Sequence, residues 1–519
     1  MRAPVFAPRF GSTEGGGRRR FFCEMNALAQ TLVIGPGNDF HAHRRYEPGP
    51  EVESFYHLRG CDLAGRACDG TACFVARNSR GEAHPGGDPR IYCLGRCFEA
   101  PATGLADTRP NIEVHSREAI VLARLVQGGA PTLDAYRRCG GYRALEKALA
   151  APRDAVLDAV ERAGLRGRGG AGFPTGRKWR AAARQDATPK FIVANADEGD
   201  AGAFSDRFLM EDDPHALIEG MALAAHATGA TRGWIYLRHE YPAARSSLDH
   251  AVAEARAAGI LGGELDFDIE VFVGHGSYVC GEESALLLSI EGRRPEVMAR
   301  PPYPTERGLF GRPTVTNNVE TFASVPWIVE HGGDAYRALG FSQSCGTKVV
   351  SLNSLFARPG LYEIEFGIPV RRIVEDIGGG LRAGALKGVI VGGPLAGIIP
   401  PHLLDTPFGF EELAAIGAGV GHGGVIAFDE RTSIAALVHH LFSFGAYESC
   451  GKCTPCRLGA RRIEEIFANT TRAKSDDAEW REIVSALKWT SLCGHGTGLG
   501  AFAESVLRYY GEELATCFA

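Results

Sequence analysis

Four cysteines near the end of the chain constrain its fold more than any other feature. Cys450, Cys453 and Cys456 follow one another at three-residue spacing, and Cys493 lies 37 residues after Cys456. Three thiolates from one tight loop and a fourth from a distant helix end suit a cubane iron–sulfur cluster. Four cysteines can also hold zinc, and the spacing alone leaves that alternative open.

The other cysteines fall into an early group and a set of isolated residues. Fourteen cysteines in a chain without a recognisable export signal indicate metal ligation or redox chemistry more than disulfides. The triplet Arg18–Arg20 could begin a twin-arginine signal, but Glu24, Asn26 and Gln30 interrupt the apolar segment that should follow. The early group consists of Cys61, Cys68, Cys73, Cys93 and Cys97, and we assign no ligand role to Cys23, Cys139, Cys280, Cys345 and Cys517.

Length and charge set the broad class. A chain of 519 residues predicts three or four domains. The formal net charge of -6, with basic residues scattered along the chain, gives no reason to expect nucleic acid or an anionic membrane as partner. No apolar run approaches the roughly 20 residues of a membrane helix. We therefore expect a cytoplasmic protein that does not span a membrane.

Local patterns divide the chain into segments of different secondary structure. Residues 1–50 are predicted to be a disordered or extended start, and residues 116–163 a helical linker with helices over Arg117–Val126 and Tyr142–Ala163. Residues 164–340 alternate short strands, such as Phe191–Val193 and Glu270–Val273, with helices, which is typical of an α/β domain. Residues 341–410 predict a small β-rich domain, and residues 411–519 a helical domain that contains the late cysteines.

A glycine-rich loop opens the α/β segment. Gly167-Arg168-Gly169-Gly170-Ala171-Gly172 satisfies the G-x-G-x-x-G pattern, which indicates a Rossmann turn only when a strand precedes it. Here the predicted helix Arg153–Ala163 precedes the loop, so we reject a standard Rossmann turn. The glycines still allow positive φ and a close approach of N–H groups to a planar or phosphorylated ligand, with Lys178 as a point charge. The alternative is a flexible surface loop.

Three further polar segments follow the glycine loop. The run Asn195–Asp200 comes after the strand Phe191–Val193, where α/β proteins place ligand contacts, although it could also be a solvated acidic turn. The run Gly274–Glu283 leads into an apolar helix and offers an anion site at the helix start. The amides of Asn317 and Asn318 can both donate and accept, as a flavin requires.

These segments, in this order and with the late cysteines, resemble the NADH-binding flavoprotein subunits of respiratory complex I, NAD-linked hydrogenases and formate dehydrogenases. The motifs are Gly164–Trp179, Asn195–Glu198, Tyr278–Glu283, Gly311–Thr321 and Glu448–Arg457. The resemblance implies an α/β multidomain chain: an atypical Rossmann-like domain that binds FMN and NAD(H), a β-grasp domain and a helical bundle with a 4Fe-4S cluster. The implied flavin and nucleotide residues are Gly167, Arg168, Gly169, Gly170, Ala171, Gly172, Phe173, Lys178, Asn195, Asp197, Glu198, Asp200, Tyr278, Gly281, Glu282, Glu283, Arg300, Tyr303, Asn317 and Asn318.

The resemblance also indicates what some of these residues contribute. Phe173, Glu283, Arg300 and Tyr303 match the dinucleotide side of the family's site. Arg300, Tyr303 and Asp200 depart from the family's usual Lys, Phe and Glu, changes that keep charge or ring but bear on affinity and on NAD or NADP preference. The hydride moves from nicotinamide to flavin, so the protein orients and tunes rather than attacks. We therefore name Glu283 as an orienting residue.

The flavin context sharpens the interpretation of both cysteine groups. A two-electron flavin needs a one-electron acceptor nearby, which zinc cannot be, so we assign Cys450, Cys453, Cys456 and Cys493 to a 4Fe-4S cluster. The early pairs Cys68/Cys73 and Cys93/Cys97 resemble those of a thioredoxin-like 2Fe-2S domain, here fused over residues 51–115. Only 19 residues separate Cys73 from Cys93, so Cys61 competes with Cys68 as ligand, and a cluster-free docking domain is the alternative.

The resemblance implies an electron-transfer subunit. The fused front domain, with no ferredoxin-like cysteine repeats at the end, is most similar to the β subunit of soluble NAD-dependent formate dehydrogenase. The expected partners are a molybdenum- or tungsten-containing catalytic subunit with iron–sulfur clusters and a small 2Fe-2S subunit. Hydrogenase and complex I flavoprotein subunits are the alternatives. A zinc-stapled scaffold without enzymatic activity is the alternative from another class, and it predicts a colourless protein.

Overall fold

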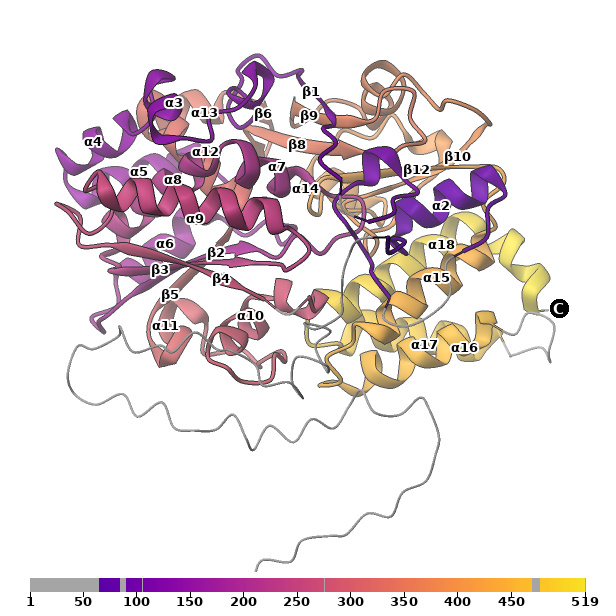
Figure 1. Ribbon diagram of the computed structural model, residues 1–519. Helices are drawn as coiled ribbons and strands as arrows, with labels where there is room; N and C mark the ends of the chain where they lie inside the picture. The colour runs from indigo at the N-terminus through magenta and orange to yellow at the C-terminus, as the bar shows by residue number, and fades with distance from the viewer. Residues whose placement is uncertain (1–64, 85–89, 105, 275, 469–476, 519) are drawn as a thin grey trace, which may run out of the picture.

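The computed structural model describes residues 65–84, 90–104, 106–274, 276–468 and 477–518. The expected extended start and Cys61 lie outside these ranges. In Figure 1 the first sheet with its helices occupies one half of the molecule, and the second sheet with the C-terminal helices occupies the other. None of the helices in the described ranges is long and apolar enough to cross a membrane.

The first sheet has four parallel strands in the order β4-β3-β2-β5. Side chains alternate between its faces: Phe191 and Val193 pack with the apolar side of α10, and Ile192 and Ala194 pack with α8. Both predicted strands, over 191–193 and 270–273, are confirmed. The strands are β2 (Phe191–Ala196), β3 (Arg232–Leu237), β4 (Asp268–Val273) and β5 (Thr314–Asn318).

Helices cover both faces of this sheet. The helix α8 begins with a proline in its first turn, ends at Gly229 in the left-handed conformation, and is buried along its whole length. The helices of this part are α3 (Leu133–Arg138), α4 (Arg143–Leu149), α5 (Arg153–Ala163), α6 (Thr175–Ala183), α7 (Ser205–Asp212), α8 (Pro214–Thr228), α9 (Pro242–Ala257), α10 (Glu283–Ile290), α11 (Pro304–Arg307), α12 (Val319–His331) and α13 (Gly333–Arg337). The single helix predicted over 142–163 is thus two helices, α4 and α5, because Pro152 divides them.

The second sheet is wider than the β-rich domain predicted over 341–410. It has six strands in the order β1-β9-β8-β12-β10-β11. The buried strand β12 pairs with β8 and β10, so the sheet continues past residue 410, and β1 adds a strand from before residue 116. Its strands are β1 (Asn111–Val114), β8 (Thr347–Leu352), β9 (Gly360–Glu365), β10 (Leu386–Val391), β11 (Ile398–Ile399) and β12 (Gly424–Asp429), and the hairpin β6 (Gly340–Phe341) and β7 (Ser344–Cys345) lies outside it.

Two predictions concern the residues before the first sheet: a thioredoxin-like domain over 51–115 and a helix over 117–126. The described part of residues 51–115 contains the helix α2 (Thr71–Arg80) and a single strand, β1, which belongs to the second sheet. The prediction of a helix over 117–126 is wrong, because this stretch is irregular up to the short 3-10 turn η4 (Leu125–Gln127). Its N–H groups at Ile120, Val121 and Leu122 donate to the buried carboxylate of Glu363 at 2.9 to 3.2 Å instead of to a helix.

The C-terminal part is a helical bundle that begins at Ile434. The helical domain predicted over 411–519 therefore starts too early, because β12 within it belongs to the second sheet. Trp480 is buried among Phe442 and Phe467 at the centre of the bundle. We call the described part of residues 51–115 the front segment. Figure 1 shows its helix α2 lying beside α15 and β12, so the front segment packs on both the bundle and the second sheet. The elements of the bundle are α15 (Ile434–Tyr447), η9 (Pro455–Gly459), α16 (Ala460–Ala468), α17 (Asp477–Thr490) and α18 (Gly494–Phe518). The short helix α14 (Phe410–Ala415) packs instead through Leu413 with the core of the second sheet.

Candidate redox site

The glycine-rich loop joins α5 to α6, so the expected helix before it is confirmed. Gly170 and Gly172 have φ of 115° and 60°, in the left-handed region that favours glycine. The side chain of Arg168 turns away from the loop: its guanidinium donates to Tyr336 Oη at 2.7 Å and to the Cys345 carbonyl at 2.8 Å. Arg168 thus anchors the loop. Its N–H donates to Thr321 Oγ1 at 2.8 Å and the N–H of Gly167 donates to the Phe173 carbonyl at 2.9 Å, so a ligand has to use N–H groups later in the loop.

The polar run after β2 lies beside the run after β4. Asn195 Nδ2 donates to the Gly281 carbonyl at 2.8 Å, and Tyr278 Oη donates to Asp200 at 2.6 Å. Asp197 is buried, and its Oδ2 has no hydrogen-bond partner in the described protein. Burial raises the pKa of Asp197 to about 8. A buried carboxyl oxygen without a partner is costly, so this position fits a ligand that supplies an N–H donor, as a flavin ring does.

Charged side chains meet at the start of α10. Lys178 Nζ lies 3.0 Å from Glu283 Oε2, and Arg300 lies 3.1 Å from Glu283 Oε1. Burial by itself would raise the pKa of Glu283, but the two cations outweigh it and hold the pKa below its usual value. Glu282 accepts from the first N–H groups of α10 and pairs with Arg300. Glu283 is therefore an ionised carboxylate between two cations, suited to orienting a polar ligand.

The paired amides at the end of β5 are oriented by the protein. Trp179 Nε1 donates to Asn317 Oδ1 at 2.8 Å. Asn318 accepts from Thr321 N at the start of α12 and donates to Asp206. Each asparagine thus has its amide plane fixed. The Asn318 amide nitrogen also lies 3.2 Å from His422 Nε2, so the amide hydrogens of Asn317 are the ones that a ligand can use.

Two aromatic side chains stand open to solvent at the edge of the site. Phe173 is 48% exposed beside the glycine loop, and Tyr303 is 52% exposed beside α11. Both rings match the dinucleotide side of the family's site in the sequence analysis. Their placement agrees with contacts to a dinucleotide that enters from solvent.

The late cysteines converge as the sequence predicted. Cys450, Cys453, Cys456 and Cys493 line one small cavity, together with residues that include Val279 and His495. A zinc ion with Zn–S bonds of about 2.3 Å would hold its sulfurs about 3.8 Å apart. Among the described residues, no three cysteine sulfurs lie within 4.8 Å of one another. An iron–sulfur cubane does not require its thiolate sulfurs to lie this close, because each binds a separate iron.

The early cysteines form two buried pairs. The buried thiols of Cys68 and Cys73 are neighbours, and Cys73 raises the pKa of the Cys68 thiol. The Sγ atoms of Cys93 and Cys97 lie 3.7 Å apart. Two thiolates on one tetrahedral iron have about this separation, so the pairs fit the two irons of a 2Fe-2S cluster. Backbone N–H groups donate to three of the sulfurs at 3.3 to 3.4 Å, from Gly70 to Cys68, from Gly95 to Cys93 and from Ala102 to Cys73.

The sequence did not predict a cluster of three buried charged side chains next to the site. His422 Nε2 lies 2.8 Å from Asp206 Oδ2 and 3.7 Å from Glu198 Oε1, and all three residues are buried. The Glu198 carboxylate, predicted to bind cofactor, accepts from the N–H groups of Asp206 and Arg207. Nothing in the sequence around His422, which lies between glycines, identifies its partners. The cluster holds Asn318 in place through Asp206.

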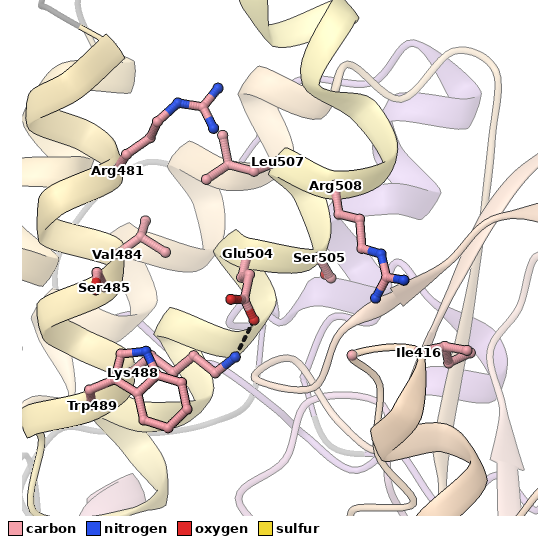
Figure 2. A pocket seen from close by; sticks show the side chains of 11 residues that line it. Ile416, Arg481, Val484, Ser485, Lys488, Trp489, Glu504, Ser505, Leu507 and Arg508 are labelled. Carbon is pink, nitrogen blue, oxygen red and sulfur yellow. Dashed lines mark hydrogen bonds and ion pairs between the residues drawn. The ribbon is translucent and has the colours of Figure 1, made fainter.

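A further pocket lies on the C-terminal bundle. It has a volume of about 510 Å³ and lies between α17, α18 and the turn at Ile416 and Gly417. Figure 2 shows the side chains that line it. Lys488 pairs there with Glu504 and lies 5.0 Å from the ring centre of Trp489. The residues that line it include none of the predicted cofactor residues. We therefore do not count it as part of the redox site.

Comparison with known proteins agrees with this geometry. Residues 160–327 match the family model described as the Nuo51 FMN-binding domain, and residues 436–517 match the NADH-ubiquinone oxidoreductase-F iron-sulfur binding region. The HndC component of an NADP-reducing hydrogenase from Solidesulfovibrio fructosivorans is 43% identical over 374 residues, 70% of this chain and 76% of that protein. The F 2 component of the NADH-quinone oxidoreductase of Rhizobium meliloti is 38% identical over 406 residues, 76% of this chain and 96% of that protein.

A solved structure extends the likeness to the fold. The crystal structure of an NAD+-reducing nickel–iron hydrogenase in the H2-reduced state contains a chain that aligns with a TM-score of 0.75 at 32% identity. The alignment covers 90% of this chain and 87% of that one.

Proposed function

Because the chain belongs to the family of NADH-binding FMN and 4Fe-4S subunits of NADH-quinone oxidoreductases and related hydrogenases, we propose that it exchanges hydride with NAD(H) at FMN and single electrons at its C-terminal cysteines. One observation carries this proposal. Val279, which follows the flavin-side residue Tyr278, forms part of the wall of the cavity lined by the four late cysteines. The segment that carries Tyr278 therefore reaches the cavity of the late cysteines, which favours direct passage of electrons.

The protein's own part in the reaction is binding and orientation. FMN, when bound, supplies the step from two-electron to one-electron chemistry. The glycine loop and Lys178 would hold the flavin, and the Asp197 carboxyl would accept a ring N–H. Glu283 orients the dinucleotide, which the exposed rings of Phe173 and Tyr303 admit.

The test is low-temperature EPR of anaerobically purified protein before and after adding NADH. A reduced 4Fe-4S signal that appears with NADH supports the route from flavin to cluster. Protein that contains flavin and iron but gives no signal with NADH or dithionite would refute it. Metal analysis of the same samples identifies the scaffold alternative, which expects zinc in place of iron.

For the early cysteines, the proposal is a 2Fe-2S cluster with Cys68 and Cys73 on one iron and Cys93 and Cys97 on the other. The paired thiols and the N–H groups aimed at the sulfurs support it. A second, slower-relaxing EPR signal is expected in dithionite-reduced protein. The variant Cys97→Ser should remove that signal and keep the 4Fe-4S signal. If iron-replete wild-type protein lacks the second signal, the front segment is a docking element instead.

The catalytic partner is the finer part of the proposal. We favour a molybdenum- or tungsten-containing formate dehydrogenase subunit, because the cysteine-bearing front segment and the flavin-binding part lie in one chain. The 90% coverage by a chain of an NAD+-reducing hydrogenase supports a hydrogenase partner equally. Metal analysis of the co-purified complex decides between them, since the first expects molybdenum or tungsten and the second expects nickel.

The docking surface for the partner is proposed to lie beside the late cysteines. Leu458, Trp489 and Leu492 are 58%, 73% and 51% exposed, and each lies within four residues of a cysteine of that group. Exposed apolar side chains gathered at a redox centre fit an interface with an iron–sulfur protein that exchanges electrons with it.

A further inference from the structure

A group of packed rings lies between the two cysteine sites and the flavin side, by which we mean the predicted flavin residues of the runs 195–200 and 278–283. We call Tyr92, Tyr278, Phe444 and His495 the aromatic junction. Tyr92 and Tyr278 each contact Phe444 edge to face, at centroid distances of 4.8 and 5.1 Å. The ring centroid of His495 lies 5.4 Å from that of Tyr278 and 6.1 Å from that of Phe444. The rings therefore form one continuous contact.

The outer rings belong to three different proposed sites. Tyr92 directly precedes Cys93, and His495 follows Cys493 by two residues and lines the cavity of the late cysteines. Tyr278 donates its hydroxyl to Asp200 on the flavin side. Phe444, on α15, lies in contact with all three rings. The junction thus brings together the front, the middle and the end of the chain.

Polar contacts hold the rings in place. Arg90 donates to Tyr92 Oη at 3.1 Å, and His495 Nε2 lies 2.9 Å from the Gly445 carbonyl. Tyr92, Phe444 and His495 are buried. Each of these rings therefore has one defined position.

Ordinary core packing in the same bundle has a different arrangement. Phe442 and Phe467 each contact Trp480, but none of the three lines the cavity of the late cysteines or neighbours a cysteine in the sequence. The aromatic junction differs because its ends coincide with ligand segments.

We propose that the aromatic junction is a direct one-electron path between the early and the late cysteine sites, with Phe444 as its central positioning residue. This inference rests on the proposed clusters at both sites. In each transfer one cluster loses one electron and the other gains it, with no bond made or broken and no proton moved. Packed rings favour such a transfer because electron tunnelling weakens steeply across empty gaps.

The test follows the departure of electrons from the early site. Dithionite-reduced full-length protein is mixed with just enough ferricyanide to oxidise the flavin and both clusters, and freeze-quench EPR records both cluster signals. The early cysteines are buried and three of the late ones are half-buried, so of the two clusters the late one is more accessible to the oxidant. In wild type we expect the early signal to decay through the junction. In Phe444→Leu this decay should slow severalfold.

Two further variants separate the path from a folding defect. Phe444→Tyr keeps the ring and should restore the wild-type decay, and Phe442→Leu, on the same helix but outside the junction, should leave it unchanged. Equal decay rates in Phe444→Leu and wild type would overturn the path while both clusters remain in place. If reduced, iron-replete wild type has no early signal, the proposed early cluster itself fails, and the path with it.

Discussion

At the scale of single residues, the site is organised by buried charges that compensate one another. Glu283 lies between Lys178 and Arg300, and His422 lies beside Asp206 and Glu198. An unpaired buried charge is expensive, so removing one member of such a group leaves its partners unfavourably placed. Single substitutions here should therefore change binding or stability in a definite direction.

The first prediction concerns the carboxylate assigned to the dinucleotide. In Glu283→Gln the orienting charge is lost, and Lys178 and Arg300 lose their common partner. A lost hydrogen bond to a charged group costs about 1.5–3 kcal/mol, so kcat/KM for NADH should fall by about tenfold or more, chiefly through KM. Steady-state NADH oxidation with ferricyanide measures this. Glu118→Gln, at an exposed carboxylate, is the control, and an unchanged KM in Glu283→Gln would contradict the assigned role.

The second prediction concerns the pH dependence of stability. Burial alone would lower the pKa of His422, but Asp206 and Glu198 outweigh burial and the opposing charge of Lys348 and raise the pKa to about 9. The folded protein therefore holds this proton more tightly than the unfolded chain, whose histidine titrates near about 6.5. The resulting stability is complete below a pH of about 6.5 and is lost as the pH rises through the folded-state pKa.

The variant His422→Gln should lack this contribution. At a pH of about 6 it should be less stable than wild type by about 3 kcal/mol, and the difference should close by about pH 10. Urea unfolding of the unliganded proteins at both pH values measures it. His402→Gln, at an exposed histidine, should match wild type throughout. Identical urea midpoints for His422→Gln and wild type at the lower pH would rule out the buried ion pair.

At the scale of elements, one buried carboxylate shapes a segment that is not a helix. Glu363, on β9, accepts from the N–H groups of Ile120, Val121 and Leu122 and from the hydroxyl of Thr347. These contacts satisfy backbone groups that a helix would otherwise pair within itself. The segment therefore owes its conformation to a strand that follows it by more than 200 residues.

The third prediction removes this carboxylate. Glu363→Ala would leave three buried N–H groups unsatisfied, at a cost of about 3 kcal/mol or more. We expect a lower thermal midpoint and faster hydrogen exchange over residues 117–126. Glu113→Ala, on the neighbouring β1, is the matched control and should leave exchange there unchanged. Wild-type exchange in Glu363→Ala would mean that other contacts hold the segment.

The sequence predicted elements whose cause is local. The strand Phe191–Ala196 and the helix α10 follow from apolar runs, and the late cysteines converge as their spacing indicated. Sequence reasoning failed where a distant partner decides the conformation. Residues 117–126 have helical composition, but Glu363 captures their N–H groups. The pairing of His422 with Asp206 joins residues more than 200 positions apart, and no local pattern reports it.

At the scale of the whole molecule, the redox residues lie where separate parts of the chain meet. The flavin side contributes Val279 to the cavity of the late cysteines, and the front segment contributes Tyr92 to the aromatic junction. Leu458, Trp489 and Leu492, each within four residues of one of these cysteines in the sequence, are exposed. The arrangement is that of one part of a larger electron-transfer assembly.

The whole-molecule prediction is that Trp489 belongs to the partner interface. Trp489→Ser should weaken coupled turnover with the partner protein severalfold, because exposed tryptophans are frequent anchors of interfaces. NADH oxidation by ferricyanide should stay at the wild-type level, since the flavin side is untouched. Phe341→Ser, at an exposed ring on β6, is the control. Wild-type coupled turnover in Trp489→Ser would place the interface elsewhere.

The strand β1 attaches the front segment to the second sheet. Residues Asn111–Val114 pair in parallel with the first four residues of β9. The chain is therefore hydrogen-bonded into the second sheet shortly after the early cysteines. A separately encoded protein leaves its complex on dilution, to an extent set by its dissociation constant. A covalently linked segment that also supplies a strand is held at a high effective concentration instead. Its cysteines therefore accompany the flavin side one to one, even at the low concentrations at which loosely bound components are lost.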